Sequence, residues 1–499
     1  MWIIGGALSG PVRFTMRFLA LPVQRSRPIV ATAKSLVPAM TPAITDAGGS
    51  APSRAARRRQ LILHGPVLVT LLHLAAPNLV VILAQAAANF LESYYVGLIG
   101  LDALAGAALV FPLVMLMQTM SGGGVGGAIA SAVARALGSG QTEKAEALAL
   151  HAVVIALVLG SLFTVAALFG GAALYQAMGG RGGALAAALT YSNVIFAGAV
   201  FLWLLNAFAS ILRGSGNMIL PAIVLVSGTV MLFGISPALI FGWGPIPALG
   251  IAGAGAALVL YYAAGSAVLL VSLLRGRRGL RLGLHHRLRL SLFAEILGVG
   301  VLGAANNLLT NLSVVLATGL VGRFGTSNLA GFGLGIRLEY LQIPLVFGIG
   351  SGVVAMVGMN VGAGHMARAR HIAWTGAMLA ISITETVGVL AAIFPQAWVG
   401  LFTADPDAIR VGSSYLRVVG PFYGCLGAGL ALYFASQGAG RMKWATMAAL
   451  ARVAVIAIGG ALGMNAGTGL TPVFIVLILA YISFAAINGL NWRRVHGGG

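Results

Sequence analysis

Long apolar stretches recur along almost the whole chain after residue 65. Each holds about 20 or more mostly apolar residues, the length of a helix that crosses a hydrocarbon core about 30 Å thick. Segments rich in Gly, Pro, Asn and Asp separate them, as is typical of turns. The stretches lack the alternation of barrel strands, so helices are predicted. Twelve spans are predicted, at residues 66–96, 103–131, 145–169, 184–212, 218–241, 248–274, 292–321, 328–358, 372–395, 408–436, 443–464 and 470–491.

Composition supports an integral membrane protein. Only 8% of the 499 residues are charged and 59% are hydrophobic, whereas a soluble domain carries charge on about a quarter of its residues. The predicted fold class is therefore all-α and membrane-embedded, because a helix satisfies its own backbone hydrogen bonds in lipid.

The net charge of +20 raises the question of nucleic-acid binding, and the distribution of the charges argues against it. If both termini are cytoplasmic, the basic run at 275–289 and most other basic residues fall in internal segments. The external loops then hold only Arg181, Arg323 and Arg410. This asymmetry follows the positive-inside rule, so we expect both termini in the cytoplasm and an even number of spans.

Two halves of the chain repeat each other. GLIGLDALAG at 97–106 matches GRFGTSNLAG at 322–331, 225 residues later. GSGQTEKA at 138–145 matches GAGHMARA at 362–369, Tyr191 matches Tyr415, and GSGNM at 214–218 matches GAGRM at 438–442, all 224 residues apart. Two six-helix lobes are predicted, related by a pseudo-two-fold axis along the membrane normal, with a cleft between them that suits transport.

Four regions are expected. Residues 1–60 are rich in arginine and proline, and we expect a disordered basic extension. Residues 61–274 and 291–494 are the two predicted lobes. Residues 275–290 form a basic cytoplasmic linker between them.

An ordered set of motifs resembles the multidrug and toxic compound extrusion (MATE) family. The set comprises an acid five positions before the glycine of VGLIG, LDALAG, GSG and GAG after the second and eighth spans, RGSGN and QGAGR after the fourth and tenth, and FGWGPIPALGIAGAGAA before the sixth. The resemblance covers about residues 66–490. It implies a secondary antiporter that exports organic, often cationic compounds in exchange for H⁺ or Na⁺.

Glu92 is the leading candidate for ion coupling. A carboxylate at membrane depth costs about 2.5–3.5 kcal/mol unless it faces a cavity, pairs or takes up a proton. The resemblance implies coupling at this first-helix position, where aspartate is usual. The alternative is a residue near the external end whose side chain reaches the interface.

Two further acids are candidates for ion coupling. Glu339 lies two positions from Arg337, so the alternative role is a charge pair, although residues two apart on a helix do not face each other. Glu385 lies in the middle of the predicted span 372–395.

Polar residues near these acids are predicted to line the substrate cavity: Gln85, Asn89, Tyr94, Asn193, Asn206 and Arg337. Where some relatives carry a seventh-helix glutamate and a tenth-helix aspartate for Na⁺, this chain has Thr310 and Leu426, and Ser236 lies near the fifth-helix acid of others. We therefore favour H⁺ over Na⁺, and expect no cofactor or metal.

The main alternative is a flippase for a lipid-linked precursor within the same superfamily, which should show a more cationic cavity. A membrane transferase is disfavoured because the chain has no DDxxD-like cluster for a metal-bound pyrophosphate. We expect a monomer in the bacterial plasma membrane.

Overall fold

The protein is built almost entirely from helices. A computed structural model describes residues 54–276, 280–283, 285–465 and 469–494, and over these ranges strand-like pairing is limited to one isolated bridge between Trp243 and Ile246. Most of the predicted extension 1–60 lies outside the described residues, but its last part belongs to helix α1 (Arg54–His64). Parts of the linker, at 277–279 and 284, also lie outside them.

The first half of the chain forms the N-lobe. Its helices are α2 (Val67–Ile99), α3 (Leu101–Gln118), η2 (Thr119–Val125), α4 (Gly126–Gly138), α5 (Thr142–Ala177), α6 (Gly182–Ala197), α7 (Ala199–Gly214), α8 (Ile219–Phe241) and α9 (Ile251–Leu274). Helix η2 is a π-helix that joins α3 to α4 within one span.

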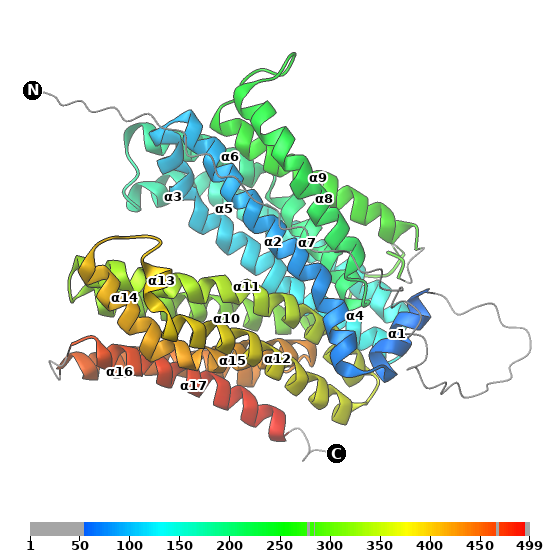
Figure 1. The fold of residues 1–499 in the computed structure, drawn as a ribbon. Coiled ribbons are helices and arrows are strands. Elements are labelled where there is room, and N and C mark those ends of the chain that lie inside the picture. The colour runs from blue at the N-terminus through cyan, green and yellow to red at the C-terminus, as the bar shows by residue number, and fades with distance from the viewer. Residues whose placement is uncertain (1–53, 277–279, 284, 466–468, 495–499) are drawn as a thin grey trace, which may run out of the picture. The chain divides into compact units, whose positions relative to one another are not determined.

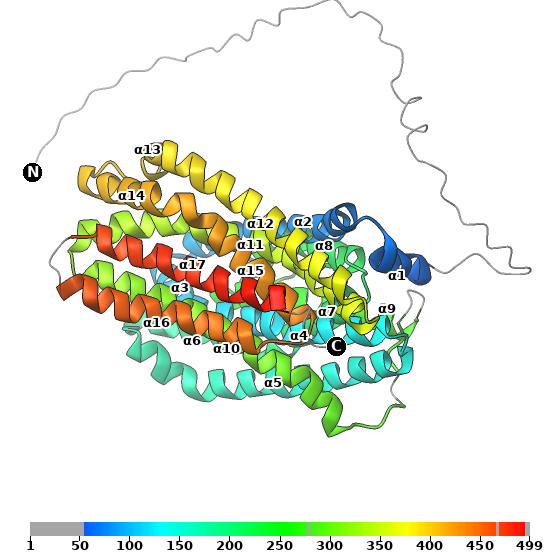
Figure 2. The same cartoon turned by 90° about the horizontal axis from the view of Figure 1, so that it is seen from below.

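The second half forms the C-lobe. Its helices are α10 (Leu290–Gly322), α11 (Thr326–Gly362), α12 (Met366–Ile393), α13 (Pro395–Val399), α14 (Pro406–Val419), η3 (Gly420–Phe422), α15 (Tyr423–Gly438), α16 (Lys443–Asn465) and α17 (Thr471–Arg494). Figure 1 shows the C-lobe helices, coloured yellow-green to red, gathered apart from the N-lobe helices, coloured blue to green. Seen from below, α15, α16 and α17 run side by side (Figure 2).

The predicted twelve-span fold is confirmed. Eleven segments of the described chain are long and apolar enough to cross a membrane, and there are twelve if α6 and α7, bent by 47°, count as one span. Every predicted span overlaps one of these segments. The chain is therefore an all-α, multi-pass membrane protein.

Matched turns support the internal repeat. Gly140, between α4 and α5, has φ 80°, and its counterpart Gly364, between α11 and α12, has φ 79°. The RGSGN and QGAGR motifs contain a similar matched pair: Gly216 has φ 76° and Gly440 has φ 72°. Glycine adopts these left-handed conformations without the steric cost of a side chain, which explains why these glycines recur in both halves.

The two lobes pack tightly together where α4 meets α11, which we call the closed end. Gly138 lies directly against the Met359 carbonyl, and Gly362 lies directly against the Arg135 carbonyl. Because glycine has no Cβ, the two backbones can approach as closely as they do in membrane helix pairs with small residues.

Charged groups also join the lobes at the closed end. The Glu295 carboxylate of α10 is 3.3 Å from Nη2 of Arg135 on α4 and 2.9 Å from Nζ of Lys144 on α5. Glu295 therefore bridges the lobes.

The π-helix η2 receives hydrogen bonds from the opposite lobe. Nε2 of Gln437, on α15, donates to the carbonyl of Gly123 at 3.0 Å and to that of Gly124 at 3.3 Å. Nδ2 of Asn307, on α10, donates to the Thr119 carbonyl at 3.1 Å. Side-chain amides of the C-lobe thus donate hydrogen bonds to backbone carbonyls where the α-helical pattern is interrupted.

Replacing Gly138 by valine should push the lobes apart at the closed end. The added side chain would overlap the Met359 carbonyl, and overpacking of this kind costs about 1–3 kcal/mol. Spin labels on the exposed residues Gln141 and Ala367 should report a longer interlobe distance in double electron–electron resonance spectroscopy. Gly170→Val is the matched control, since a Cβ there meets nothing within 4 Å. An unchanged distance in Gly138→Val would contradict the proposed role of this contact.

Candidate functional site

A cavity of about 780 Å³ lies between the two lobes. The N-lobe contributes α2, α3, η2, α6, α7, α8 and α9 to its walls, and the C-lobe contributes α10, α11, α15 and α16. Its volume falls within the range of sites for drug-sized ligands. Both repeats therefore contribute to a single site, as the predicted cleft requires.

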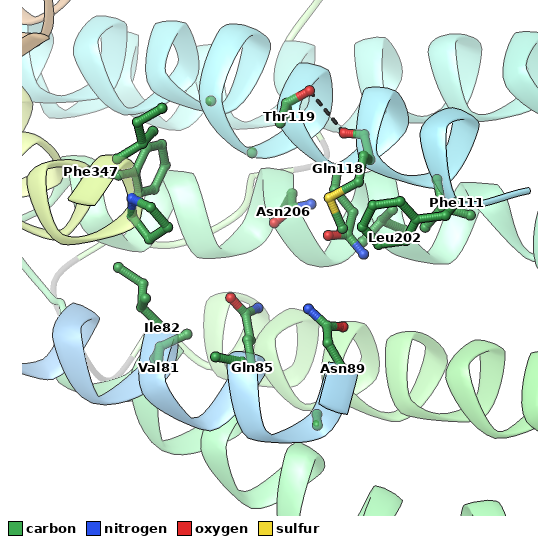
Figure 3. A pocket seen from close by; sticks show the side chains of 18 of the residues that line it. Val81, Ile82, Gln85, Asn89, Phe111, Gln118, Thr119, Leu202, Asn206 and Phe347 are labelled. Carbon is green, nitrogen blue, oxygen red and sulfur yellow. Dashed lines mark hydrogen bonds between the residues drawn. The ribbon is translucent and has the colours of Figure 1, made fainter. Parts of the chain in front are cut away.

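Amide side chains face each other across the N-lobe part of the cavity. Figure 3 shows Gln85 and Asn89 on α2 pointing toward Gln118 and Asn206. Nδ2 of Asn206 donates to the Ser121 hydroxyl at 2.8 Å. These groups lie among apolar residues such as Phe111 and Phe347, so the cavity combines hydrophobic walls with a few polar groups that can orient a ligand.

Glu92 lines the same cavity and is the one carboxylate among its described lining residues. The Tyr191 hydroxyl, on α6, donates a hydrogen bond of 3.0 Å to Glu92 Oε1. No cation pairs with Glu92 among the salt bridges of the described chain. A membrane carboxylate with a neutral donor and cavity access can be stabilised by a proton or by a cationic ligand.

Glu339 occupies a different environment, in the core of the C-lobe. It accepts hydrogen bonds from the hydroxyls of Tyr415, at 3.3 Å, and Tyr481. Its Oε1 lies 3.8 Å from Nη2 of Arg452, and both side chains are at most 4% exposed. The sequence alternative of a charge pair is thus realised with Arg452 of α16, not with Arg337. Arg452 also lines the cavity.

Glu385 makes a local structural contact. Its Oε2 accepts a 2.7 Å hydrogen bond from the backbone N–H of Gly424, in the first turn of α15. The first N–H groups of a helix lack partners within the helix, and a carboxylate there is favourable. Glu385 is not among the residues that line the cavity.

Three residues predicted to line the cavity face away from it. Tyr94, Arg337 and Asn193 are exposed, and none of them is among the residues that line the cavity. Each lies two positions from a residue that faces inward: Glu92, Glu339 and Tyr191 respectively. Two positions correspond to about 200° around an α-helix, so the side chains point in opposite directions. Gln85, Asn89 and Asn206 do line the cavity, together with Glu92.

The sequence analysis missed several polar lining residues, notably Gln118, Tyr191, Tyr262, Arg213 and Arg452. The match between Tyr191 and Tyr415 was a usable signal, because each tyrosine donates to a buried or cavity carboxylate, Glu92 or Glu339. Arg213 belongs to the last turn of α7 and lines the cavity.

Metal-binding residues are not grouped in the described part of the chain. No set of three or more His, Cys, Asp or Glu side chains lies close enough together there to hold an ion.

A family model matches both halves of the chain. The model, described as MatE, matches residues 77–239 and 304–462. Among curated relatives, a FAD transporter of Shewanella oneidensis is 25% identical over 375 residues, covering 74% of this chain and 82% of the relative. A probable multidrug resistance protein NorM of Deinococcus radiodurans is 30% identical over 370 residues, covering 69% and 75%.

Solved structures share the fold. A MATE structure in the bent conformation superposes with a TM-score of 0.81 at 23% identity, covering 88% of this chain and 97% of that chain. A MOP superfamily transporter from Pyrococcus furiosus gives a TM-score of 0.80 at 22% identity, covering 89% and 99%.

Substituting Glu339 by glutamine should destabilise the C-lobe. The change leaves the Arg452 charge buried without its partner, and breaking such a pair costs about 3–5 kcal/mol. We expect a lower unfolding temperature in detergent, and partial recovery in the double variant Glu339→Gln with Arg452→Gln. Glu385→Gln is the control, since a glutamine oxygen can still accept from Gly424. Equal unfolding temperatures for Glu339→Gln and wild type would show that the pair contributes no stability.

Proposed function

Because the chain belongs to the MatE family of membrane transporters, we propose that it is a secondary antiporter that exports organic compounds from the cytoplasm in exchange for H⁺. The observation that carries this proposal is the cavity between the lobes, with Glu92 as its carboxylate and Tyr191 as the neutral hydrogen-bond donor to it.

In the proposed cycle, a proton and a cationic group of the cargo compete for the Glu92 carboxylate. In its charged form, Glu92 attracts a cationic group of the cargo. Protonation removes that charge and the attraction with it, so the cargo leaves the cavity. The Tyr191 hydroxyl holds the side chain in place in both forms, because a hydroxyl oxygen can also accept from a protonated carboxyl group.

Alternation between the two sides of the membrane is proposed to occur at the closed end. Arg59, Arg135, Lys144 and Arg368 lie there, and the positive-inside rule favours the cytoplasm for such a cluster. Both termini would then be cytoplasmic, and the state in Figure 1 would be closed toward the cytoplasm. Separation of the lobes at Glu295 and Gly138 would admit cargo from that side.

A proton suits this cavity better than Na⁺. Na⁺ needs several oxygen ligands at once, whereas H⁺ needs one basic group. At the C-lobe positions where acids bind Na⁺ in some relatives, Thr310 and Leu426 line the cavity here.

A second candidate function is transport of an anionic cargo, such as a lipid-linked precursor carrying phosphate. The observation that favours it is the presence of two arginines, Arg213 and Arg452, among the lining residues. Arg452 is neutralised by Glu339, which leaves Arg213 as the cation to be explained. We further propose a monomer in the bacterial inner membrane, because one chain supplies both walls of the cavity.

Efflux driven by a pH gradient tests the proposal. In inside-out membrane vesicles acidified by respiration, wild type should accumulate the cationic dye rhodamine 123, and Glu92→Gln should abolish accumulation because the amide cannot exchange a proton. An imposed Na⁺ gradient alone should drive no accumulation.

The control is Glu385→Gln, which changes a carboxylate outside the cavity and should leave dye transport close to that of wild type. Membrane levels of each variant are compared by immunoblot. Normal pH-driven transport by Glu92→Gln would exclude Glu92 as the coupling residue. A wild type that moves dye only with Na⁺ would exclude H⁺ as the coupling ion.

A further inference from the structure

Arg213 is a cation in the cavity wall, and no described residue forms a salt bridge with it. It belongs to the last turn of α7, and it lines the cavity with Tyr261, Leu205 and Leu225. Its Nε atom is buried and has no hydrogen-bond partner. None of the salt bridges in the described part of the chain includes Arg213.

The other arginine that lines the cavity, Arg452, is neutralised by a carboxylate. Arg452 lies 3.8 Å from the Glu339 carboxylate and stacks over the ring of Tyr481, 5.3 Å from its centroid. Two tyrosine hydroxyls complete the hydrogen bonding of Glu339. Arg213 has no such carboxylate, although both arginines lie in membrane-spanning segments.

An unpaired charge inside a membrane protein is costly and marks a functional site by default. The position of Arg213 in the last turn of α7 favours a positive charge through the helix dipole. That effect applies to any cation near a helix C-terminus, and an exposed side chain would profit from it equally well. It does not explain why this guanidinium faces a cavity.

Arg213 and Glu92 line different parts of the cavity wall, Glu92 on α2 and Arg213 in the last turn of α7. Tyr191, the hydrogen-bond donor to Glu92, precedes Arg213 by 22 residues along α6 and α7. At about 1.5 Å per residue this corresponds to roughly 30 Å of helix, shortened somewhat by the 47° bend. We therefore consider Arg213 as a subsite separate from Glu92.

We propose that Arg213 forms an anion-binding subsite of the cavity, which takes a carboxylate or phosphate group of the transported compound. A guanidinium presents several N–H donors in one plane and matches both groups in a bidentate manner. The cargo then includes amphipathic organic zwitterions and anions, whose apolar part lies against the hydrophobic walls. This inference rests on the proposed function only in treating the cavity as the cargo site.

Two matched pairs of fluorescent probes test the subsite. Rhodamine 110 has a free carboxylate, whereas rhodamine 123 is its methyl ester. Flavin mononucleotide has a phosphate, whereas riboflavin lacks it. Binding of each probe to the purified protein in nanodiscs is measured by fluorescence anisotropy, without any ion gradient, so failure of H⁺ coupling does not affect the result.

Arg213→Gln should weaken binding of the probe that carries the carboxylate or phosphate about tenfold or more, the range for a lost hydrogen bond to a charged group. Binding of its counterpart without that group should be nearly unchanged. A selective loss in the rhodamine pair identifies a carboxylate subsite, and one in the flavin pair identifies a phosphate subsite. Arg213→Lys should retain part of the selectivity. Arg337→Gln is the matched control, because Arg337 is exposed and lies outside the cavity.

Equal losses for both members of each pair, or no loss in either pair, would overturn the proposal. If Arg213→Gln does not elute as a single folded species, wild type alone decides. In at least one pair, wild type should bind the probe that carries the carboxylate or phosphate more tightly than its counterpart, and added salt should reduce that difference. A wild type without any such preference would overturn the proposal equally.

Discussion

Hydrocarbon offers no hydrogen-bond partner to a polar group, and this constraint governs how the interrupted helices and the acidic residues of the two lobes are paired. Backbone groups satisfy it by forming helices. Where a helix is interrupted, another element supplies the missing partners: Gln437 and Asn307 donate to the carbonyls of η2, and Glu385 accepts from the Gly424 N–H at the start of α15. Because these donors and acceptors come from other helices, the interruptions also fix how the helices pack.

The acidic residues within the spans illustrate the same constraint in three forms. Glu339 forms an ion pair with Arg452, accepts hydrogen bonds from two tyrosines, and is buried away from the cavity. Glu385 is held by a backbone donor. Glu92 has one neutral donor and lines the cavity. The difference between a structural and an exchangeable carboxylate therefore lies in its partners, since all three are glutamates within predicted spans.

The architecture could be predicted from the sequence, because helix length and the repeat of turn motifs are local or periodic signals. The twelve spans and two lobes needed no tertiary information. The site was only partly predictable. Of the residues predicted to line the cavity, Gln85, Asn89 and Asn206 do so, whereas Tyr94, Asn193 and Arg337 do not. Partners such as Arg452 for Glu339, more than a hundred residues later, leave no local trace.

The π-helix η2 accounts for a discrepancy between the two halves. The repeat motifs before it are 225 residues apart and those after it are 224 apart. The span Leu101–Gly138, which contains η2, has 38 residues, and its counterpart α11 has 37. A π-turn accommodates one additional residue within a helix. The halves thus differ by a single-residue insertion or deletion that arose after their common ancestor was duplicated. The twofold symmetry of the protein is therefore broken at η2. The amides of Gln437 and Asn307 in the C-lobe donate to η2, whereas the continuous helix α11 does not require equivalent donors from the N-lobe.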